Sequence, residues 1–136
     1  MKKSWQEKYD TGRDPVVTTL DRDFWGMKAG DTMLIATPSE LDGLIRKISF
    51  GETKSVQDIR RSLAQKHGAD FTCPLTTGIF LRIIAERALE QVASGVPLIK
   101  VTPFWRVIEP TSPLAKKLSC GPEFIQNLRN QEPAGR

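Results

Sequence analysis

The segment from Pro74 to Gly95 constrains the fold more than any other, because it is apolar on several sides of one helix. Its broad apolar face consists of Ile79, Phe80, Ile83, Ile84, Ala88 and Val92, and a further side carries Leu81, Ala85 and Leu89. Pro74 suits the first turn of a helix, and glycines such as Gly95 commonly end one. A helix that is apolar around much of its circumference is expected to lie at the centre of a domain. Arg82 and Glu86, four residues apart, are expected to form an exposed ion pair.

Two shorter amphipathic helices are predicted before this segment. The first begins after Thr37-Pro38 and ends at Phe50-Gly51, and its apolar stripe is Leu41, Leu44, Ile45 and Ile48. The second begins after Ser55, where Asp58 completes a capping pair, and ends at Gly68. Its buried face is Val56, Ile59 and Leu63, whereas Arg60, Arg61 and Lys66 project outward. The single histidine, His67, is expected at the end of this helix.

The remaining segments show weaker patterns. The β-branched run from Leu98 to Ile108, interrupted at Thr102-Pro103, predicts two short strands or extended segments, and a last helix is expected from about Pro122 to Gln131. Residues 1–36 lack periodicity and contain turn-rich stretches, so we expect an extended arm that packs on the domain. Residues 37–132 would form the domain, and residues 133–136 a tail. The expected fold class is mainly α with a short β element, in the outline of a winged helix-turn-helix domain.

Composition excludes several classes of protein. A chain of 136 residues is the size of one domain, and no apolar run approaches the roughly 20 residues of a membrane-spanning helix. The basic N-terminus has no apolar stretch behind it, so no secretory signal is expected and the cytoplasm is the expected location. Two cysteines and one histidine offer little for a disulfide framework, a metal site or a His-centred triad. We expect no metal and no cofactor. A net charge of +4 is compatible with a nucleic-acid partner.

Two segments resemble one known family. Residues 45–53 read Ile-Arg-Lys-Ile-Ser-Phe-Gly-Glu-Thr and are followed by Asp58-Ile59-Arg60, and residues 96–108 contain the core Pro-Phe-Trp-Arg-Val. In their order and spacing from about Thr37 to Glu132, these motifs are similar to the DNA-binding domain of the alkylguanine-DNA alkyltransferases, the methylated-DNA–protein cysteine methyltransferase family. The family's active-site core reads Pro-Cys-His-Arg-Val. The resemblance implies a helical domain that enters the minor groove and flips a damaged guanine out of the duplex.

Compared position by position, this sequence lacks the two residues that perform the family's alkyl transfer. Phe104 replaces the alkyl-accepting cysteine and Trp105 replaces its activating histidine, and neither ring can accept an alkyl group as a thiolate does. Pro103 and Arg106 match. The family's nucleotide-flipping tyrosine would fall at Val56, and the arginine that fills the gap left by the base near Gly78. Alkyltransferase-like proteins, in which the cysteine is replaced, bind alkylated DNA and mark it for repair, and Phe104 resembles a variant of that replacement.

The candidate site residues follow from this resemblance. Pro103, Phe104, Trp105 and Arg106 would form the loop equivalent to the active site, in which Phe104 and Trp105 either line a base pocket or pack in the core, and Arg106 either supports the loop or binds a phosphate. The candidate DNA-binding residues, which would set affinity more than sequence preference, are Lys54, Arg60, Arg61, Lys66, Arg82 and Lys100, and Lys116 and Lys117 also flank the expected loop and wing. Arg82 could substitute for the arginine lost at Gly78. The segment between the second helix and Pro74 is longer than the family's usual turn.

Three functions remain open from the sequence. The first is a non-catalytic protein that binds double-stranded, possibly alkylated DNA, recognises alkylated or flipped bases and recruits a repair protein. The second is a protein-interaction or regulatory module on a helix-turn-helix scaffold, which the loss of both flipping residues favours. The third is an enzyme that acts through Cys73, whose thiolate would be stabilised at a helix start. Cys120 is expected to be inert.

Overall fold

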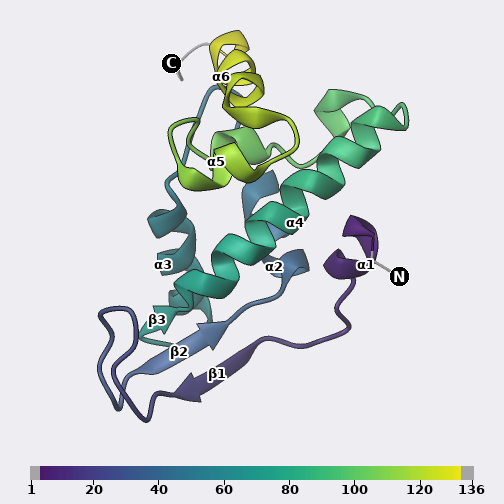
Figure 1. The fold of residues 1–136 in the computed structure, drawn as a ribbon. Helices are drawn as coiled ribbons and strands as arrows, with labels where there is room; N and C mark the ends of the chain where they lie inside the picture. Colours follow the sequence, from purple (N-terminus) through teal and green to yellow (C-terminus); the bar gives the residue numbers. More distant parts are fainter. Residues whose placement is uncertain (1–3, 133–136) are drawn as a thin grey trace.

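The computed structural model describes residues 4–132, and these form a mainly helical domain with a small sheet. Its elements in chain order are α1 (Trp5–Tyr9), β1 (Val16–Thr19), β2 (Thr32–Ile35), α2 (Pro38–Arg46), α3 (Val56–His67), β3 (Phe71–Thr72), α4 (Pro74–Ala93), the 3-10 helices η1 (Leu98–Lys100) and η2 (Phe104–Arg106), α5 (Pro113–Lys117) and α6 (Gly121–Gln131). The long helix α4 runs through the middle, with the sheet near its first residues and with α5 and α6 on one side of it (Figure 1).

Helix α4 is central, as its sequence predicts. Its residues Leu81, Ile84, Ala85 and Ala88 are fully buried in the main core, and α1, α2 and η2 all pack against it. The expected exposed ion pair between Arg82 and Glu86 is wrong. Glu86 is buried, and its carboxylate accepts hydrogen bonds from the Ser119 backbone N–H at 3.1 Å and the Ser119 hydroxyl at 2.5 Å. This side of α4 is covered by the segment around Ser119, so the Glu86 carboxylate binds that segment and not Arg82.

Both shorter helices form where the caps predict them. Thr37 accepts a hydrogen bond from the Glu40 N–H at the start of α2, and Ser55 and Asp58 form a capping box at the start of α3. Gly68 ends α3 with a left-handed φ of 65°, which suits glycine. Helix α2 ends at Arg46, four residues before the predicted end at Phe50. His67 is the last residue of α3, as expected.

The sheet lies where the sequence did not indicate it. Strands β1 and β2 are antiparallel, with Thr19 opposite Thr32, and β3 pairs in parallel with β2, with Thr72 opposite Leu34. The region expected to be an extended arm therefore contains α1 and two strands. Its helix α1 packs on α4, and residues 10–15 connect α1 to the start of β1 (Figure 1).

The strands predicted between Leu98 and Ile108 do not form. This segment contains η1 and η2 instead, and its side chains Val101, Phe104, Val107 and Ile108 are buried in the main core. Pro97 and Pro103 precede the two 3-10 helices, so neither position can donate a strand hydrogen bond. The strand pair that would make a wing is therefore absent from this segment. The last helix, α6, begins one residue before its predicted start and ends at Gln131, and the expected tail 133–136 lies outside the described residues.

Within residues 4–132, no helix has the length and apolar character needed to cross a membrane.

Candidate functional site

The loop that resembles the alkyltransferase active site is closed and mostly buried. Phe104 is 1% exposed and Trp105 is 4% exposed, and their rings meet edge to face with centroids 5.4 Å apart. Phe104 belongs to the main core, which also contains Leu81, Ile84 and Ile125. Its ring therefore fills the interior beneath α4. Trp105 and Phe50 line a cavity of about 420 Å³ beside the end of α6, and Pro103, which is buried, lines a smaller one with Arg46.

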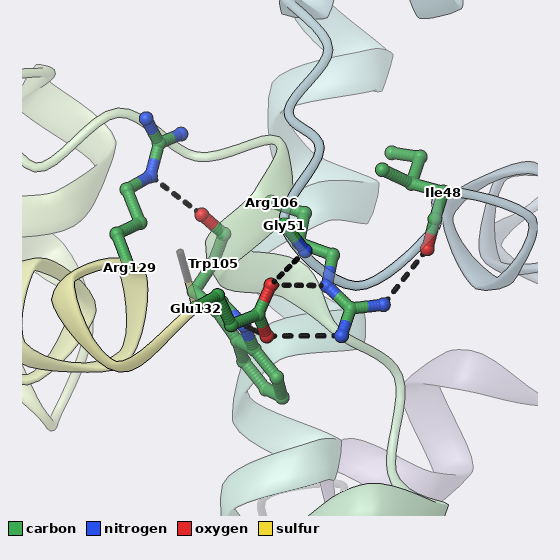
Figure 2. A network of polar contacts seen from close by, with 6 residues as sticks. All are labelled: Ile48, Gly51, Trp105, Arg106, Arg129 and Glu132. Atoms are coloured by element: carbon green, nitrogen blue, oxygen red, sulfur yellow. Dashed lines mark hydrogen bonds and ion pairs between the residues drawn. The ribbon is translucent and has the colours of Figure 1, made fainter. Parts of the chain in front are cut away.

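Arg106 joins this loop to two distant parts of the chain (Figure 2). Its Nε and Nη2 donate to the two carboxylate oxygens of Glu132, each at 2.9 Å, and its Nη1 donates to the Ile48 carbonyl at 2.8 Å. The Arg106 carbonyl in turn accepts from the Lys54 N–H at 2.9 Å. A guanidinium bound in this forked manner is held in one geometry. In the folded chain Arg106 therefore acts as a clamp for the loop.

Glu132 is the partner of Arg106, and each of its two carboxylate oxygens accepts two hydrogen bonds. Besides Arg106, it accepts hydrogen bonds from the Trp105 indole N–H at 2.7 Å and from the Gly51 backbone N–H at 3.0 Å (Figure 2). Burial by itself raises the pKa of this carboxyl, but the hydrogen bonds from Arg106, Gly51 and Trp105 outweigh that effect and hold its pKa below the ordinary value. Arg129 adds a further tie, because its Nε donates to the Trp105 carbonyl at 2.7 Å.

The start of the same loop is fixed to α2 and α1. The Thr102 hydroxyl donates to Oδ1 of the buried Asp42, and Oδ2 of Asp42 accepts from the Tyr9 hydroxyl at 2.8 Å and from Arg46 Nε at 3.3 Å. Burial, followed by the hydrogen bond to Asp42, raises the pKa of Tyr9 to about 12. The loop from Thr102 to Arg106 is thus held at both ends.

The two positions of the family's flipping residues border separate cavities. Val56 lines one of about 230 Å³ together with Ile108, Glu109 and Ser112. Gly78 lines another of about 330 Å³, which also includes Trp25, Ile79 and Arg82. Leu114 borders both cavities, so they are neighbours at the first turn of α5. Neither lining includes Phe104.

The six predicted DNA-binding residues do not gather on one face. Arg60 and Arg61 of α3 line a common groove of about 430 Å³, and Lys54 lies exposed just before that helix. Lys66 forms an ion pair with Glu40 of α2 at 2.9 Å, and His67 Nε2 lies 2.7 Å from the same carboxylate oxygen.

The other two lie elsewhere. The Arg82 guanidinium lies 5.5 Å from the centroid of the Trp5 ring, on the side of α4 that faces α1. Lys100 is exposed in η1, where its carbonyl accepts from Arg46 Nη1 at 3.3 Å. Arg60 and Arg61 are therefore the two that the fold places together in one groove.

The cysteines lie away from the loop. Cys73 precedes α4, is 3% exposed and packs with Met27 and Met33 in a second apolar cluster. Burial raises the pKa of the Cys120 thiol, which disfavours its thiolate. Within residues 4–132, no group of three or more His, Cys, Asp or Glu side chains is placed to hold a metal ion.

Sequence reasoning missed two exposed aromatic residues. Trp25 is 66% exposed, and its φ of 50° lies in the left-handed region that bulky residues rarely adopt. Phe71 is 43% exposed at the border of the groove that contains Arg60. The unusual length of the segment before Pro74 was the available signal for Phe71. Nothing in the sequence around Trp25 indicates a left-handed tryptophan.

Comparison with known proteins gives no match: no family model, curated protein or solved structure matches this chain.

Proposed function

We propose that the chain is a non-catalytic DNA-binding protein of the alkyltransferase-like type, which recognises alkylated or flipped bases and recruits a repair protein. The observation that carries the proposal is the meeting of the two resembling segments around Arg106. Its guanidinium binds the Ile48 carbonyl, and its carbonyl binds the Lys54 N–H. Motifs joined by bonds that span 58 residues (Ile48 to Arg106) and 52 residues (Lys54 to Arg106) thus form one unit, as a shared fold of this type requires. Helices α3 and α4 would be its helix-turn-helix pair.

The surroundings of the loop support a role without alkyl transfer. Phe104 and Trp105 carry no nucleophile, and both are buried. Cys73 belongs to a different cluster and is itself buried, so it is a poor substitute acceptor. A protein with this loop can bind DNA without accepting an alkyl group from it.

An electrophoretic mobility shift on duplexes with and without an alkylguanine tests the proposal. We expect tighter binding to the alkylated duplex, weaker binding as salt rises, and an unchanged intact mass of the protein after incubation. Lys54→Gln should weaken binding and flatten its salt dependence, because Lys54 is exposed beside α3. Lys28→Gln is the matched control, since Lys28 lies in the hairpin between β1 and β2 and pairs with Asp23. Equal, weak and salt-insensitive binding to both duplexes would contradict the proposal.

A second candidate function, a protein-interaction module, is favoured by one observation. Trp25, Leu75 and Ile79 are each at least half exposed around the cavity at the first half of α4. Exposed apolar clusters of this kind often mark protein contacts. If Trp25→Ser and Ile79→Ser leave duplex binding unchanged but abolish association with a partner, this second function gains support. If they reduce duplex binding instead, the surface belongs to the first.

A further inference from the structure

A groove lies between α3, which belongs to the resembling region, and the short strand β3, which the resemblance does not explain. We call it the α3–β3 groove. Its volume is about 430 Å³, and its lining includes Gln57, Arg60, Arg61 and Gln65 of α3 and Phe71 of β3. The four α3 residues stand at positions i, i+3, i+4 and i+8, so they form one polar face of the helix. Phe71 comes from the segment that is longer than the family's usual turn.

Arg60 supplies a cation without a protein partner. Among residues 4–132 its guanidinium makes no hydrogen bond and no ion pair, and its Nε is buried without an acceptor. Its backbone carbonyl is engaged, because it accepts from the Thr72 hydroxyl at 2.7 Å. A buried donor without an acceptor is unfavourable. The other guanidinium nitrogens of Arg60 also have no acceptor among residues 4–132, and they are the atoms that a ligand oxygen in the groove would bind.

The other charged groups of the groove leave it open to an anion. Arg61 pairs with Asp58 at 3.1 Å, but both side chains are at least half exposed, and such surface pairs contribute little. Asp70 is already engaged, because its Oδ2 accepts from the backbone N–H and the hydroxyl of Thr32 at 2.9 and 3.1 Å. The lining of the groove therefore has two guanidinium groups against one carboxylate, whose Oδ2 is bound to the sheet.

Phe71 adds a stacking surface beside these cations. Its side chain is 43% exposed, although it lies on a strand. Arginine forks match phosphate oxygens, and an exposed aromatic ring can stack on an unpaired base. The two together suit a nucleotide whose base is free, and a duplex does not present such a base at its surface.

We infer that the α3–β3 groove binds single-stranded DNA, with Arg60 and Arg61 on one backbone phosphate and Phe71 against the neighbouring base. The inference rests on the proposed function in that nucleic acid is the partner. It adds a second contact for an unpaired strand, such as one next to a flipped or damaged position. The contact involves α3 and β3 and requires neither the Phe104 loop nor the cavities beside Val56 and Gly78.

Fluorescence anisotropy with a labelled ten-nucleotide oligothymidylate tests this inference. Arg60→Gln should weaken binding at least tenfold and reduce the salt slope by about 0.7, the value for one lost phosphate contact on a single strand. Arg60→Lys, which keeps the charge but loses the fork, should have an intermediate effect. Phe71→Leu should weaken binding by about fivefold or more. Arg22→Gln is the control and should bind as wild type, because Arg22 is exposed in the β1–β2 hairpin beside Asp21.

Competitors identify which part of the ligand is read. An oligomer of sugar and phosphate without bases should bind more weakly than oligothymidylate, and Phe71→Leu should not weaken it further. Thymidine monophosphate and inorganic phosphate should compete only at far higher concentrations. If either competes as well as the oligomer, the groove is an anion or nucleotide site and the inference of a bound strand is overturned.

Wild-type protein provides a measurement that does not depend on variants folding. An oligonucleotide containing 5-bromouracil should cross-link, under ultraviolet light, to the peptide that contains Phe71, as mass spectrometry can show. Cross-links confined to other peptides, or wild-type binding by Arg60→Gln, would overturn the inference. If the strand-binding tests fail but the protein still shifts the alkylated duplex, the proposed function stands and only the inference about the groove is overturned.

If the protein does not shift the duplex but binds the single strand in a way that depends on Arg60, recognition of the alkylated duplex is overturned and single-strand binding by the α3–β3 groove stands.

Discussion

Arg106 in η2 and Arg60 in α3 are both partly buried arginines, but their surroundings are opposite. Arg106 donates to Glu132 through two nitrogens and to the Ile48 carbonyl through a third. Arg60 has no acceptor for its guanidinium among residues 4–132. The same contrast holds for two phenylalanines, since Phe104 is 1% exposed in the loop and Phe71 is 43% exposed in the groove. In the loop that resembles an active site, the side chains are thus buried or bound to other parts of the chain. In the α3–β3 groove, Arg60 has no acceptor within the described part of the chain and Phe71 is partly exposed, so both can contact a ligand.

The two phenylalanines give the largest expected difference. Phe104→Ala should lower the free energy of unfolding by about 3–5 kcal/mol, because it leaves a cavity in the main core. Phe71→Ala should lower it by less than about 1 kcal/mol, since much of the ring is already in water. Urea denaturation of wild type and both variants measures the two losses in unfolding free energy. Equal losses would mean that the loop and the groove do not differ in the way described.

Replacing the two arginines should also cost more stability in the loop than in the groove. Arg106→Met should cost about 3 kcal/mol of unfolding free energy, because it leaves Glu132 buried without its countercharge. Arg60→Met should change stability by no more than about 1 kcal/mol and could raise it, since it removes an unpaired buried donor. Thermal melting with urea denaturation tests this. A large loss for Arg60→Met would show that its guanidinium has a structural partner after all.

Acid should weaken the loop through Glu132. Its folded pKa lies below the ordinary value, so the unfolded chain binds the proton more readily. This stabilisation is present above the unfolded pKa of about 4.3 and is lost as pH falls through the folded pKa. The stability difference between wild type and Glu132→Gln should therefore shrink as pH is lowered from 6 into that range. A difference that stays constant would contradict the contribution of the ionised carboxylate.

The smallest effect is expected at the opposite end of the loop, at Tyr9. Tyr9→Phe should cost about 1 kcal/mol near neutral pH, the typical contribution of one hydrogen bond. The folded pKa of Tyr9 is raised from 10.0 to about 12, so its contribution is complete below pH 10 and declines as pH rises towards 12. Stability curves of wild type and Tyr9→Phe should converge over that interval. Parallel curves would show that the hydroxyl does not differ between the folded and unfolded chains.

Helices were predictable because their signals are local. Ser55, Asp58 and Gly68 fix both ends of α3 within one stretch of chain, and the apolar pattern after Pro74 indicates a central helix. The sheet was not predictable, because β1 is only four residues long with every side chain exposed. Its third strand pairs Thr72 with Leu34, which is distant in sequence. Such a strand exists only when its partner is in place.

For the candidate site residues too, the sequence gives the chemistry of each side chain, and only the tertiary structure gives its partners. That Phe104 and Trp105 cannot act as a cysteine and a histidine follows from their chemistry alone. That Arg82 faces Trp5, that Lys66 is paired with Glu40, and that Glu86 binds Ser119 depend on which elements pack together. No spacing rule within a helix contains that information.

The sequence by itself determined the central helix, the capped ends of α3 and the absence of a nucleophile at position 104, because each depends on neighbouring residues or on the chemistry of one side chain. Tertiary structure alone decided that Arg106 is bound by Glu132 and the Ile48 carbonyl and that the Arg60 guanidinium is left without an acceptor among residues 4–132. Both side chains are arginines with five donors, and only the packing of distant segments determines which of them meets an acceptor.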